Sequence, residues 1–313
     1  MRLTGLIDLM PEAARNLRSL RSLLASEPAL DRVLARQDVP LVVNEAARAF
    51  VLAGLSEASA RRPILVVTAL HNEAQRLSHD LAAVLGGEQV ALFAPWGTLP
   101  FERVSPALEV MGQRLRLLAR LRDPDGGPAL IVASVRALLQ RLDPAAVTDP
   151  MVCRVGETLD SLELTARLVD FGYRREQQVE HRGEFAVRGS IVDVFPSTGD
   201  CPVRIDLWGD EVDRLTEFAV SDQRATDAVK ELEIYPCREF RPSAQARQRA
   251  QQLLVDEPWG REQWERIANG ELFDGMESWL PWLVADEVLL PDLLDNDAWV
   301  ILTEARRIRD RAA

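Results

Sequence analysis

Two runs of consecutive apolar residues constrain the fold of this chain more than any other feature: 63–68 (P-I-L-V-V-T) and 129–133 (A-L-I-V-A). Unbroken apolar runs of this length are typical of parallel strands that are buried on both faces of a sheet. A shorter run at 90–93 predicts a further strand, and helical spacing follows at 72–85 and 105–121. Strands that alternate with helices in this way predict an open α/β sheet.

Segments before and after these runs complete the predicted sheet. Two amphipathic helices are expected within 11–34, and the short apolar run 39–43 predicts a strand, followed by a turn at Asn44 and a helix at 45–55. Near the end, 298–303 (A-W-V-I-L-T) predicts a last buried strand that rejoins the first sheet. Because the chain stops soon afterwards, we expect it to be part of a longer protein.

A second kind of domain is predicted between these segments. Prolines and small polar residues at 144–150 mark a boundary, and β signals dominate after it. A helix is expected at 159–171, and strand segments are expected at 185–195, 203–208 and 212–219. The last two lie on either side of a glycine-containing turn, so we expect them to form a hairpin.

These patterns divide the chain into three predicted parts. The first part of the open-sheet lobe is 1–147, and a compact antiparallel α+β domain follows at 148–235. The segment 236–313, with helices at 244–254 and 261–268, is expected to complete the lobe.

Composition narrows the class of function. The 313 residues allow two or three domains, because single cores rarely exceed about 250 residues. The net charge of -12 argues against a surface coated for nucleic-acid binding, which needs basic residues to neutralise phosphates. The N-terminus lacks a signal pattern, and no apolar run approaches the ~18 residues needed to span a bilayer. We therefore expect a cytoplasmic protein with no membrane partner.

No metal site or disulfide framework is predicted. The three cysteines form no C-x-x-C pair, and the three histidines lack the spacing of metal ligands. These residues are Cys153, Cys201, Cys237, His71, His79 and His181.

Two further groups of residues are expected to be structural. Asp193 lies in a strand segment without a paired carboxylate, so a salt bridge or hydrogen bond is expected there and not a catalytic base. Trp259, Trp264, Trp279 and Trp282 lie in an acidic segment, and we expect them to be packing residues and not a platform for stacking bases.

The strand, turn and helix predicted at 39–55 would be the place for a nucleotide-binding loop. Such a loop needs glycines beside the phosphates, a lysine for the β/γ-phosphates and a hydroxyl on magnesium. Here Val42 and Ala47 stand at the two glycine positions, Arg48 at the lysine and Ala49 at the hydroxyl. The sequence therefore predicts no ATP site.

The end of the strand at 298–303 leads to the same conclusion. ATPases of this architecture place an acidic pair after such a strand, and its first carboxylate holds magnesium. Thr303 stands at the first position and Glu304 remains at the second. With both motifs degenerate, we expect neither ATP nor magnesium to bind here.

The stretch 173–196 (Y-R-R-E-Q-Q-V-E-H-R-G-E-F-A-V-R-G-S-I-V-D-V-F-P) combines arginines with a strand segment. Strand alternation places Arg188 on one face with Ala186 and Ser190, and Phe185 on the other face with Val187 and Ile191. Arg188 is therefore expected to point to solvent. Arginines in such a place suit a protein contact, because the planar guanidinium pairs bidentately with carboxylates.

Several motifs carry a family resemblance that runs nearly from end to end. They are W-G-T-L-P-F-E at 96–102, G-Y-R at 172–174, H-R-G-E-F-A-V-R-G-S-I-V-D-V-F-P at 181–196, V-R-I-D-L-W-G-D-E-V-D at 203–213, G-M-E-S-W at 275–279 and V-I-L-T-E-A-R at 300–306. The chain resembles the N-terminal, UvrB-like part of the bacterial transcription-repair coupling factor (Mfd) family. UvrB itself keeps its phosphate loop, its Asp-Glu pair and a long aromatic hairpin, whereas the segment after Phe93 is too short and too poor in aromatic residues for that hairpin.

The resemblance implies a fold and a partner. The first and last segments would form one RecA-like lobe of the P-loop type without a working nucleotide site, and 148–235 would be an inserted domain that recruits UvrA. The implied UvrA contacts are Arg175 and Arg188. For Arg174 and Arg182 a solvated surface position is favoured over contact, and for Phe185 contact and core position are both open.

Three functions remain to be compared. The leading hypothesis is a non-enzymatic recruitment module of transcription-coupled nucleotide excision repair, and the alternative is an ATP-dependent DNA helicase or translocase lobe of the UvrB type. A sequence-independent DNA-binding module is a third hypothesis, which the acidic charge opposes. The resemblance implies that ATP, magnesium, RNA polymerase and DNA are bound by later domains outside this chain, and that those domains contact and mask the UvrA surface.

Overall fold

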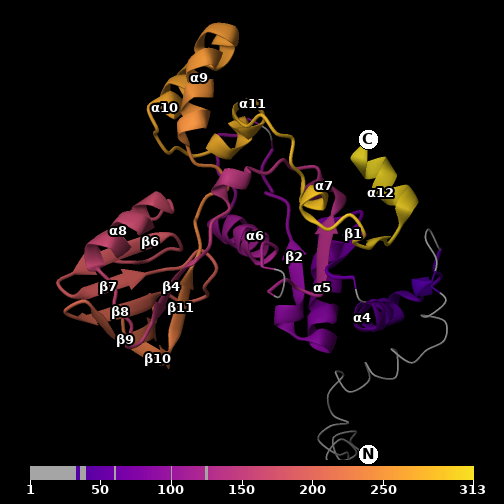
Figure 1. Cartoon of the computed structure of the whole chain (residues 1–313), viewed down its shortest axis with the longest axis horizontal. Coiled ribbons are helices and arrows are strands. Elements are labelled where there is room, and N and C mark those ends of the chain that lie inside the picture. Colours follow the sequence, from indigo (N-terminus) through magenta and orange to yellow (C-terminus); the bar gives the residue numbers. More distant parts are fainter. Residues whose placement is uncertain (1–32, 36–39, 60, 100, 124–125) are drawn as a thin grey trace, which may run out of the picture. The chain divides into compact units, whose positions relative to one another are not determined.

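A computed structural model describes residues 33–35, 40–59, 61–99, 101–123 and 126–313 (Figure 1). The chain forms two units. Unit 1 consists of Met1–Pro95, Arg120–Gln140 and Pro291–Ala313, and unit 2 consists of Trp96–Ala119 and Arg141–Leu290. The domain bounds 1–147, 148–235 and 236–313 describe a different division and stay a prediction. Except for residues 33 and 34, the helices expected within 11–34 lie outside the described residues.

Unit 1 contains a parallel sheet with the strand order β12-β1-β3-β2. Its strands are β1 (Ile64–Thr68), β2 (Val90–Phe93), β3 (Leu130–Ser134) and β12 (Val300–Leu302). Every residue of β1 and β3 is buried, as their unbroken apolar runs predicted. The helices of this unit are α4 (Arg48–Ala58), α5 (His71–Leu85), α7 (Val135–Leu138) and α12 (Ala305–Ala312). This combination of a parallel sheet with helices confirms the α/β class.

Two predictions about the sheet of unit 1 were wrong. Residues 40–43 form no strand, and the side chain of Val42 is fully exposed. Instead of extending the sheet, Pro40, Leu41 and Val43 line a groove together with residues of the edge strand β12. The strand β12 does rejoin the first sheet, but it is an edge strand, and Val300 and Leu302 are about half exposed instead of buried.

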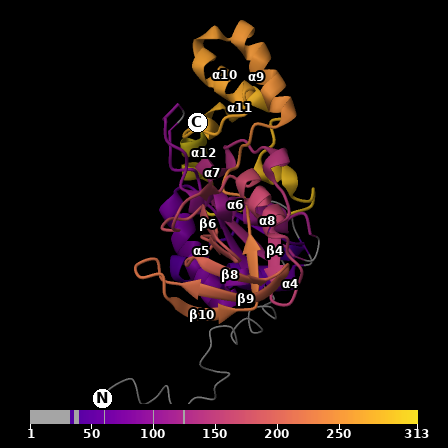
Figure 2. The same cartoon turned by 90° about the vertical axis from the view of Figure 1, so that its left-hand side faces the viewer.

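Unit 2 contains a six-stranded sheet with the order β10-β9-β8-β7-β6-β5, in which all neighbours are antiparallel except β5 and β6. Figure 2 shows β8, β9 and β10 running side by side. The strands are β5 (Arg174–Arg175), β6 (Glu184–Arg188), β7 (Ile191–Val194), β8 (Val203–Trp208), β9 (Glu211–Phe218) and β10 (Ala225–Val229). The predicted hairpin of β8 and β9 is confirmed.

The segment 185–195 is two strands and not one. Gly189 and Ser190 form a tight turn in which Gly189 has a φ of 62°, a left-handed value that favours glycine. As a result Arg188 pairs with Ile191 across the turn, and β6 and β7 form a hairpin.

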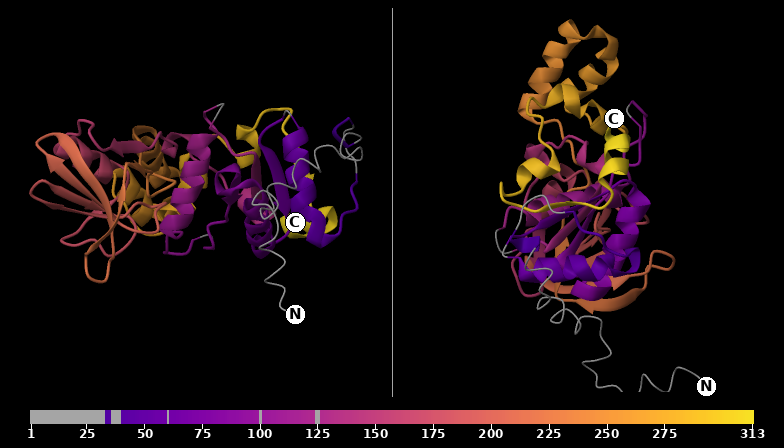
Figure 3. Two further views of the ribbon diagram at one scale, coloured as in Figure 1. Left: turned by 90° about the horizontal axis from the view of Figure 1, so that it is seen from below. Right: turned by 90° about the vertical axis from the view of Figure 1, so that its right-hand side faces the viewer.

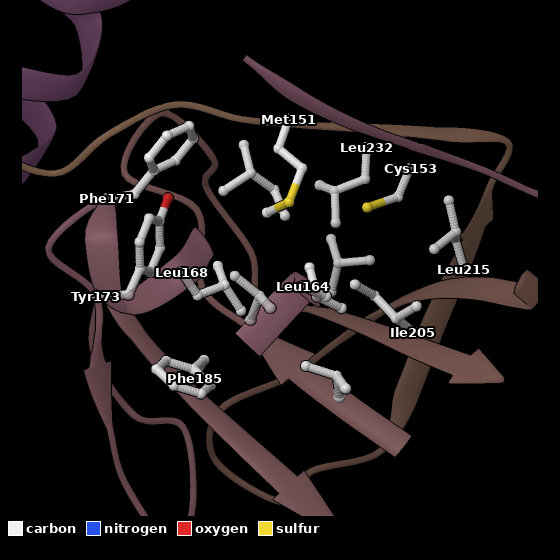
Figure 4. Close-up of a cluster of buried hydrophobic side chains, with 14 of the residues drawn as sticks. Met151, Cys153, Leu164, Leu168, Phe171, Tyr173, Phe185, Ile205, Leu215 and Leu232 are labelled. Carbon is white, nitrogen blue, oxygen red and sulfur yellow. The ribbon is translucent and has the colours of Figure 1, made fainter. Parts of the chain in front are cut away.

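The core of unit 2 lies under one face of this sheet. A two-stranded sheet of β4 (Met151–Arg154) and β11 (Glu231–Ile234) and the helix α8 (Ser161–Asp170) supply its other side. Buried side chains from all these elements meet in one cluster, which Figure 4 shows in part. The strand segments β10 and β11 were not predicted. In β10 no residue is buried, and in β11 only Leu232 and Ile234 are buried between exposed glutamates, so neither segment has a long apolar pattern.

The rest of unit 2 is helical. The remaining α-helices are α6 (Leu108–Arg120), whose last residue belongs to unit 1, α9 (Ala244–Asp256), α10 (Arg261–Ala268) and the short α11 (Leu280–Leu283). Figure 3 shows α9 and α10 as a helical pair, and their buried residues form a cluster around Trp264. The 3-10 helices among the described residues are η3 (Glu45–Ala47), η4 (Gly87–Gln89), η5 (Pro144–Ala146), η6 (Pro258–Gly260), η7 (Met276–Trp279) and η8 (Leu290–Leu293).

Candidate protein-interaction site

The two faces of the six-stranded sheet have different chemistry. On one face Phe185, Val192, Ile205 and Leu207 pack against α8 in the core of unit 2. Successive residues of a strand point to opposite faces, so the residues between them point away from this core. We call this second side the outer face, and it carries Arg188, Asp193, Arg204, Asp206, Trp208 and Arg214.

Asp193 organises the outer face through two arginines on neighbouring strands. Its buried carboxylate accepts hydrogen bonds from Arg204 Nε at 2.7 Å and Arg204 Nη2 at 3.0 Å, and a third from Arg188 Nη2. The hydrogen bonds to Asp193 raise the pKa of Arg204 above its usual value. The salt-bridge role predicted for Asp193 is therefore confirmed.

Arg188 lies at the end of β6 and is exposed, as strand alternation predicted. Its side chain keeps 48% of its accessible surface although one nitrogen donates to Asp193. The guanidinium of Arg188 is therefore fixed by Asp193 and still has N–H donors free for a partner.

Arg174 and Arg175 form the short edge strand β5, which pairs with β6 in parallel. Both side chains are exposed. Arg174 Nη2 lies 3.7 Å from Glu184 Oε1, whereas no ion pair joins Arg175 to another residue of the described part of the chain. Adjacent strands lie about 4.8 Å apart and rise about 3.3 Å per residue, so the Cα atoms of Arg175 and Arg188 lie about 11 Å apart.

Glu184 anchors the loop that leads into β6. Its Oε2 accepts hydrogen bonds from the backbone amides of Glu180 at 2.9 Å and His181 at 2.8 Å. Burial alone would raise the pKa of this carboxyl, but the two amide bonds and the charges of His181 and Arg174 outweigh it and lower the pKa. The ionised Glu184 therefore fixes the loop beside Arg174.

Arg182 is held by its own domain. Its Nε donates to the carbonyl of Gly199 at 2.8 Å, its Nη2 donates to Asp200 at 2.8 Å, and its guanidinium lies over the ring of Phe195. These contacts favour a structural role over contact with a partner.

Phe185 is a core residue, so its inclusion among the contact residues is corrected. Its side chain is fully buried, and Figure 4 shows it among the other buried side chains of the cluster, below Tyr173. The ring points away from the outer face because odd-numbered residues of β6 face α8. It can affect a partner only through the position of β6.

The sequence interpretation missed Trp208. This residue ends β8 on the outer face and is 82% exposed. The signal was present in V-R-I-D-L-W, where buried Val203, Ile205 and Leu207 alternate with outward residues. The hairpin was predicted, but its two faces were not compared.

The four tryptophans of the acidic segment pack together with Phe101. Trp264 is fully buried, and its ring lies 4.9 Å from that of Trp279 between centroids. Trp259 is about half exposed, and its Nε1 donates to Glu257 at 2.6 Å. The packing role is confirmed for Trp264, and Trp279 and Trp282 are partly buried against its cluster.

The two degenerate nucleotide motifs meet in unit 1. Arg48 and Thr303 line one groove of about 860 Å³, together with apolar residues such as Val43, Leu55 and Ile301. Lysine is absent from the groove lining in the described part of the chain, and the one carboxylate there, Asp297, pairs with Arg61 at 3.6 Å. These residues do not fit a magnesium nucleotide.

The backbone groups beside this groove are already hydrogen-bonded within the chain. Asn44 Oδ1 accepts a hydrogen bond from the amide of Ala46, where a phosphate loop would offer that amide to a phosphate. The amide and hydroxyl of Thr303 both donate to the carbonyl of Val67, and Glu304 pairs with Arg307 at 2.6 Å. Val42, Ala47 and Ala49 are not among the residues that line the groove, and their side chains are hydrocarbon only.

The described residues lack two kinds of feature. They contain no cluster of three or more His, Cys, Asp or Glu side chains arranged to hold a metal ion. No helix among them is long and apolar enough to cross a membrane.

Comparison with known proteins shows what the chain is similar to. Residues 151–240 match the family model of the UvrB interaction domain. Over 94% of its length the chain is 37% identical to the transcription-repair-coupling factor of Mycobacterium tuberculosis. The chain is related to the transcription-repair coupling factors. The corresponding proteins of Myxococcus xanthus and Escherichia coli are 36% and 31% identical over 77% and 75% of this chain. The chain spans 25%, 21% and 21% of the lengths of these three relatives.

Residues 151–240, which match the UvrB interaction domain, contain the whole six-stranded sheet of this chain. The outer face and the arginines of β5 and β6 therefore lie inside residues 151–240. The groove with the degenerate nucleotide motifs lies outside that range.

Proposed function

We propose that this chain is a non-enzymatic recruitment module of transcription-coupled nucleotide excision repair that binds UvrA. The observation that carries the proposal is the UvrB interaction domain at residues 151–240, whose sheet presents Arg174, Arg175 and Arg188 to solvent along one edge. In this proposal unit 1 is a RecA-like lobe that no longer binds nucleotide, and the α+β domain is inserted into it.

Arg175 and Arg188 are the proposed contacts. Arg188 is held by Asp193, so little side-chain freedom remains to be lost when a partner binds. Arg175 makes no ion pair with the described residues, so its charge is available to a carboxylate of UvrA. Arg175 pairs with Phe185, so its side chain points to the opposite side of the sheet from Arg188. The two Cα atoms lie about 11 Å apart, so a partner that contacts both arginines must reach around the β5–β6 edge, which a standard interface is large enough to do.

The absence of an enzymatic role is proposed from the residues of the groove in unit 1. An arginine, a threonine and apolar side chains stand where a phosphate-binding loop and a magnesium carboxylate would be needed. ATP hydrolysis, DNA translocation and RNA polymerase binding are proposed for other parts of the longer relatives. A cytoplasmic location follows from this role.

Binding of UvrA tests the proposal. Calorimetry with UvrA would compare the unaltered chain with Arg175→Ala and Arg188→Ala, and with Arg224→Ala as a matched control in the β9–β10 loop. Removal of a hot-spot arginine costs about 2 kcal/mol, which is a loss of about 30-fold in affinity. The control should bind within twofold of the unaltered chain. If neither hot-spot variant loses affinity, the contact lies elsewhere.

A further inference from the structure

Trp208 is a large apolar side chain that the domain leaves uncovered. It is 82% exposed, and no hydrogen bond, ring contact or cation–π contact joins it to another residue of the described part of the chain. Isolated exposed apolar residues are common on protein surfaces, so exposure alone has no functional meaning. Its position relative to Arg188 is the second observation.

The strand register places Trp208 near Arg188 on the outer face. Arg188 pairs with Ile191, and Ile191 pairs with Asp206, so Arg188 and Asp206 lie in one row across three strands. Trp208 is two residues further along β8. The amide of Leu207 donates to the carbonyl of Ser190 at 2.9 Å, so the end of β8 lies beside the β6–β7 turn.

The distance between the two side chains suits one interface. Two strand spacings of about 4.8 Å and two residue rises of about 3.3 Å put the Cα atoms of Arg188 and Trp208 about 12 Å apart. A standard interface buries about 800 Å² on each partner, which corresponds to a disc of about 16 Å radius. A partner that is centred on Arg188 therefore covers Trp208 as well.

Both side chains are presented by a rigid platform. The backbone of Trp208 pairs with Glu211 across the β8–β9 hairpin, and the preceding residue, Leu207, is buried in the core. Arg188 is held by the buried Asp193. Tryptophan and arginine are the residue types most often found at interface hot spots, and rigid presentation lowers the entropy lost on binding.

We propose that Trp208 is an apolar anchor of the same contact to which Arg188 belongs. The inference rests on the proposed binding of UvrA. It requires a surface of UvrA that offers an apolar pocket about 12 Å from a carboxylate that pairs with Arg188. We assign Arg188 and Trp208 to one partner and not to two because the outer face is continuous between them.

The decisive variant is Trp208→Ala, measured by calorimetry against UvrA. Its matched control is Leu162→Ala, because Leu162 is also an exposed apolar residue, 79% exposed, but lies on α8, which packs against the opposite face of the sheet. We expect Trp208→Ala to weaken binding by about 30-fold, the effect of losing a hot-spot side chain. The control should bind within twofold.

A second measurement does not depend on how the alanine variant folds. The difference in tryptophan emission between the unaltered chain and Trp208→Phe reports on Trp208 alone. In the free chain this difference signal should be quenched readily by acrylamide, and UvrA should protect it.

The outcomes separate the two proposals. If Arg188→Ala weakens binding while Trp208→Ala binds normally and Trp208 stays open to acrylamide, the anchor is overturned and the recruitment function stands. If the unaltered chain does not bind UvrA, both proposals fail together. Loss of affinity in Trp208→Ala with protection of the unaltered side chain supports the anchor.

Discussion

At Asp193 one buried carboxylate connects the arginines of two neighbouring strands. A carboxylate in such a place is costly to bury unless its hydrogen bonds are complete, and here three nitrogen donors supply them. Removing its charge leaves Arg204, which is mostly buried, without its counter-ion.

Asp193→Asn should therefore lower the free energy of unfolding by about 2 kcal/mol, since hydrogen bonds to charged groups contribute about 1.5–3 kcal/mol. Urea denaturation at pH 7 measures this loss. Asp206→Asn is the control, because Asp206 pairs with the exposed Arg214 and such pairs contribute less than about 1 kcal/mol. Equal losses for the two variants would contradict the role given to burial.

Local sequence predicted some of these residues and not others. The alternation of side chains along one strand was enough to predict that Arg188 is exposed, because alternation does not depend on neighbouring strands. The partners of Asp193 depend on the register between β7 and β8, which no local pattern specifies. The core position of Phe185 stayed open for a similar reason, since the sequence does not show which face of β6 meets α8.

Glu184 gives a prediction for the dependence of stability on pH. Its pKa in the folded chain lies below the ordinary value, because the amide hydrogen bonds outweigh burial. A depressed folded pKa adds stability that is fully present above the unfolded pKa and is lost as the pH falls through the folded pKa. Between pH 7 and pH 3 the urea midpoint of the unaltered chain should therefore fall.

The variant Glu184→Gln should be less stable at pH 7 by about 1 kcal/mol and should lose less stability on acidification. The exposed Glu176→Gln is the control and should follow the unaltered chain. A Glu184→Gln curve parallel to that of the unaltered chain would show that this carboxylate does not contribute to acid sensitivity.

At the scale of elements, buried parallel strands were the easiest to predict. The apolar runs of β1 and β3 need no knowledge of their neighbours, because both faces are covered. Edge elements were predicted less well. The strand β12 has one neighbour and exposes part of its apolar run, and residues 40–43 pair with no strand. The hairpin of β6 and β7 was missed because no turn was predicted at Gly189.

Two glycines of the domain allow a paired test of element packing. Gly183 and Gly189 both have left-handed backbone, with φ of 78° and 62°. An added Cβ at Gly183 would lie 2.6 Å from Leu108 Cδ1 of α6 and 3.2 Å from Cys237 Sγ, whereas nothing lies within 4 Å at Gly189. Only at the first position would an added Cβ push α6 and the loop before β6 apart.

Gly189→Ala should cost about 1–2 kcal/mol, the strain of left-handed backbone. Gly183→Ala should cost about 3 kcal/mol, because overpacking adds to the same strain. The difference between their free energies of unfolding, from urea titrations, isolates the contact of α6 with the loop before β6. No difference would mean that Leu108 moves aside at little cost.

At the scale of the whole molecule, the chain carries a parallel sheet in unit 1 and a largely antiparallel sheet with exposed arginines in unit 2. The degenerate motifs could be read from sequence, because every required residue type except the second acidic residue, Glu304, is missing at a fixed position. Their meeting in one groove required the structure, since Arg48 and Thr303 are far apart in the chain. Neither side of this groove supplies the groups that a magnesium nucleotide needs.

The rival function, an ATP-dependent helicase or translocase lobe, makes the opposite prediction about this groove. A ligand that binds only the folded state at 100 times its dissociation constant adds about 2.7 kcal/mol, which raises the Tm of a unit of 150–250 residues by several degrees. We expect millimolar Mg-ATP to leave the thermal unfolding of the chain unchanged, because the amide of Ala46 is already bonded to Asn44 and Arg48 stands where the lysine is needed. Tripolyphosphate with the same magnesium concentration is the control for non-specific binding of phosphate to arginine. A saturable rise in Tm with Mg-ATP, absent with tripolyphosphate, would restore nucleotide binding to unit 1 and with it the rival function.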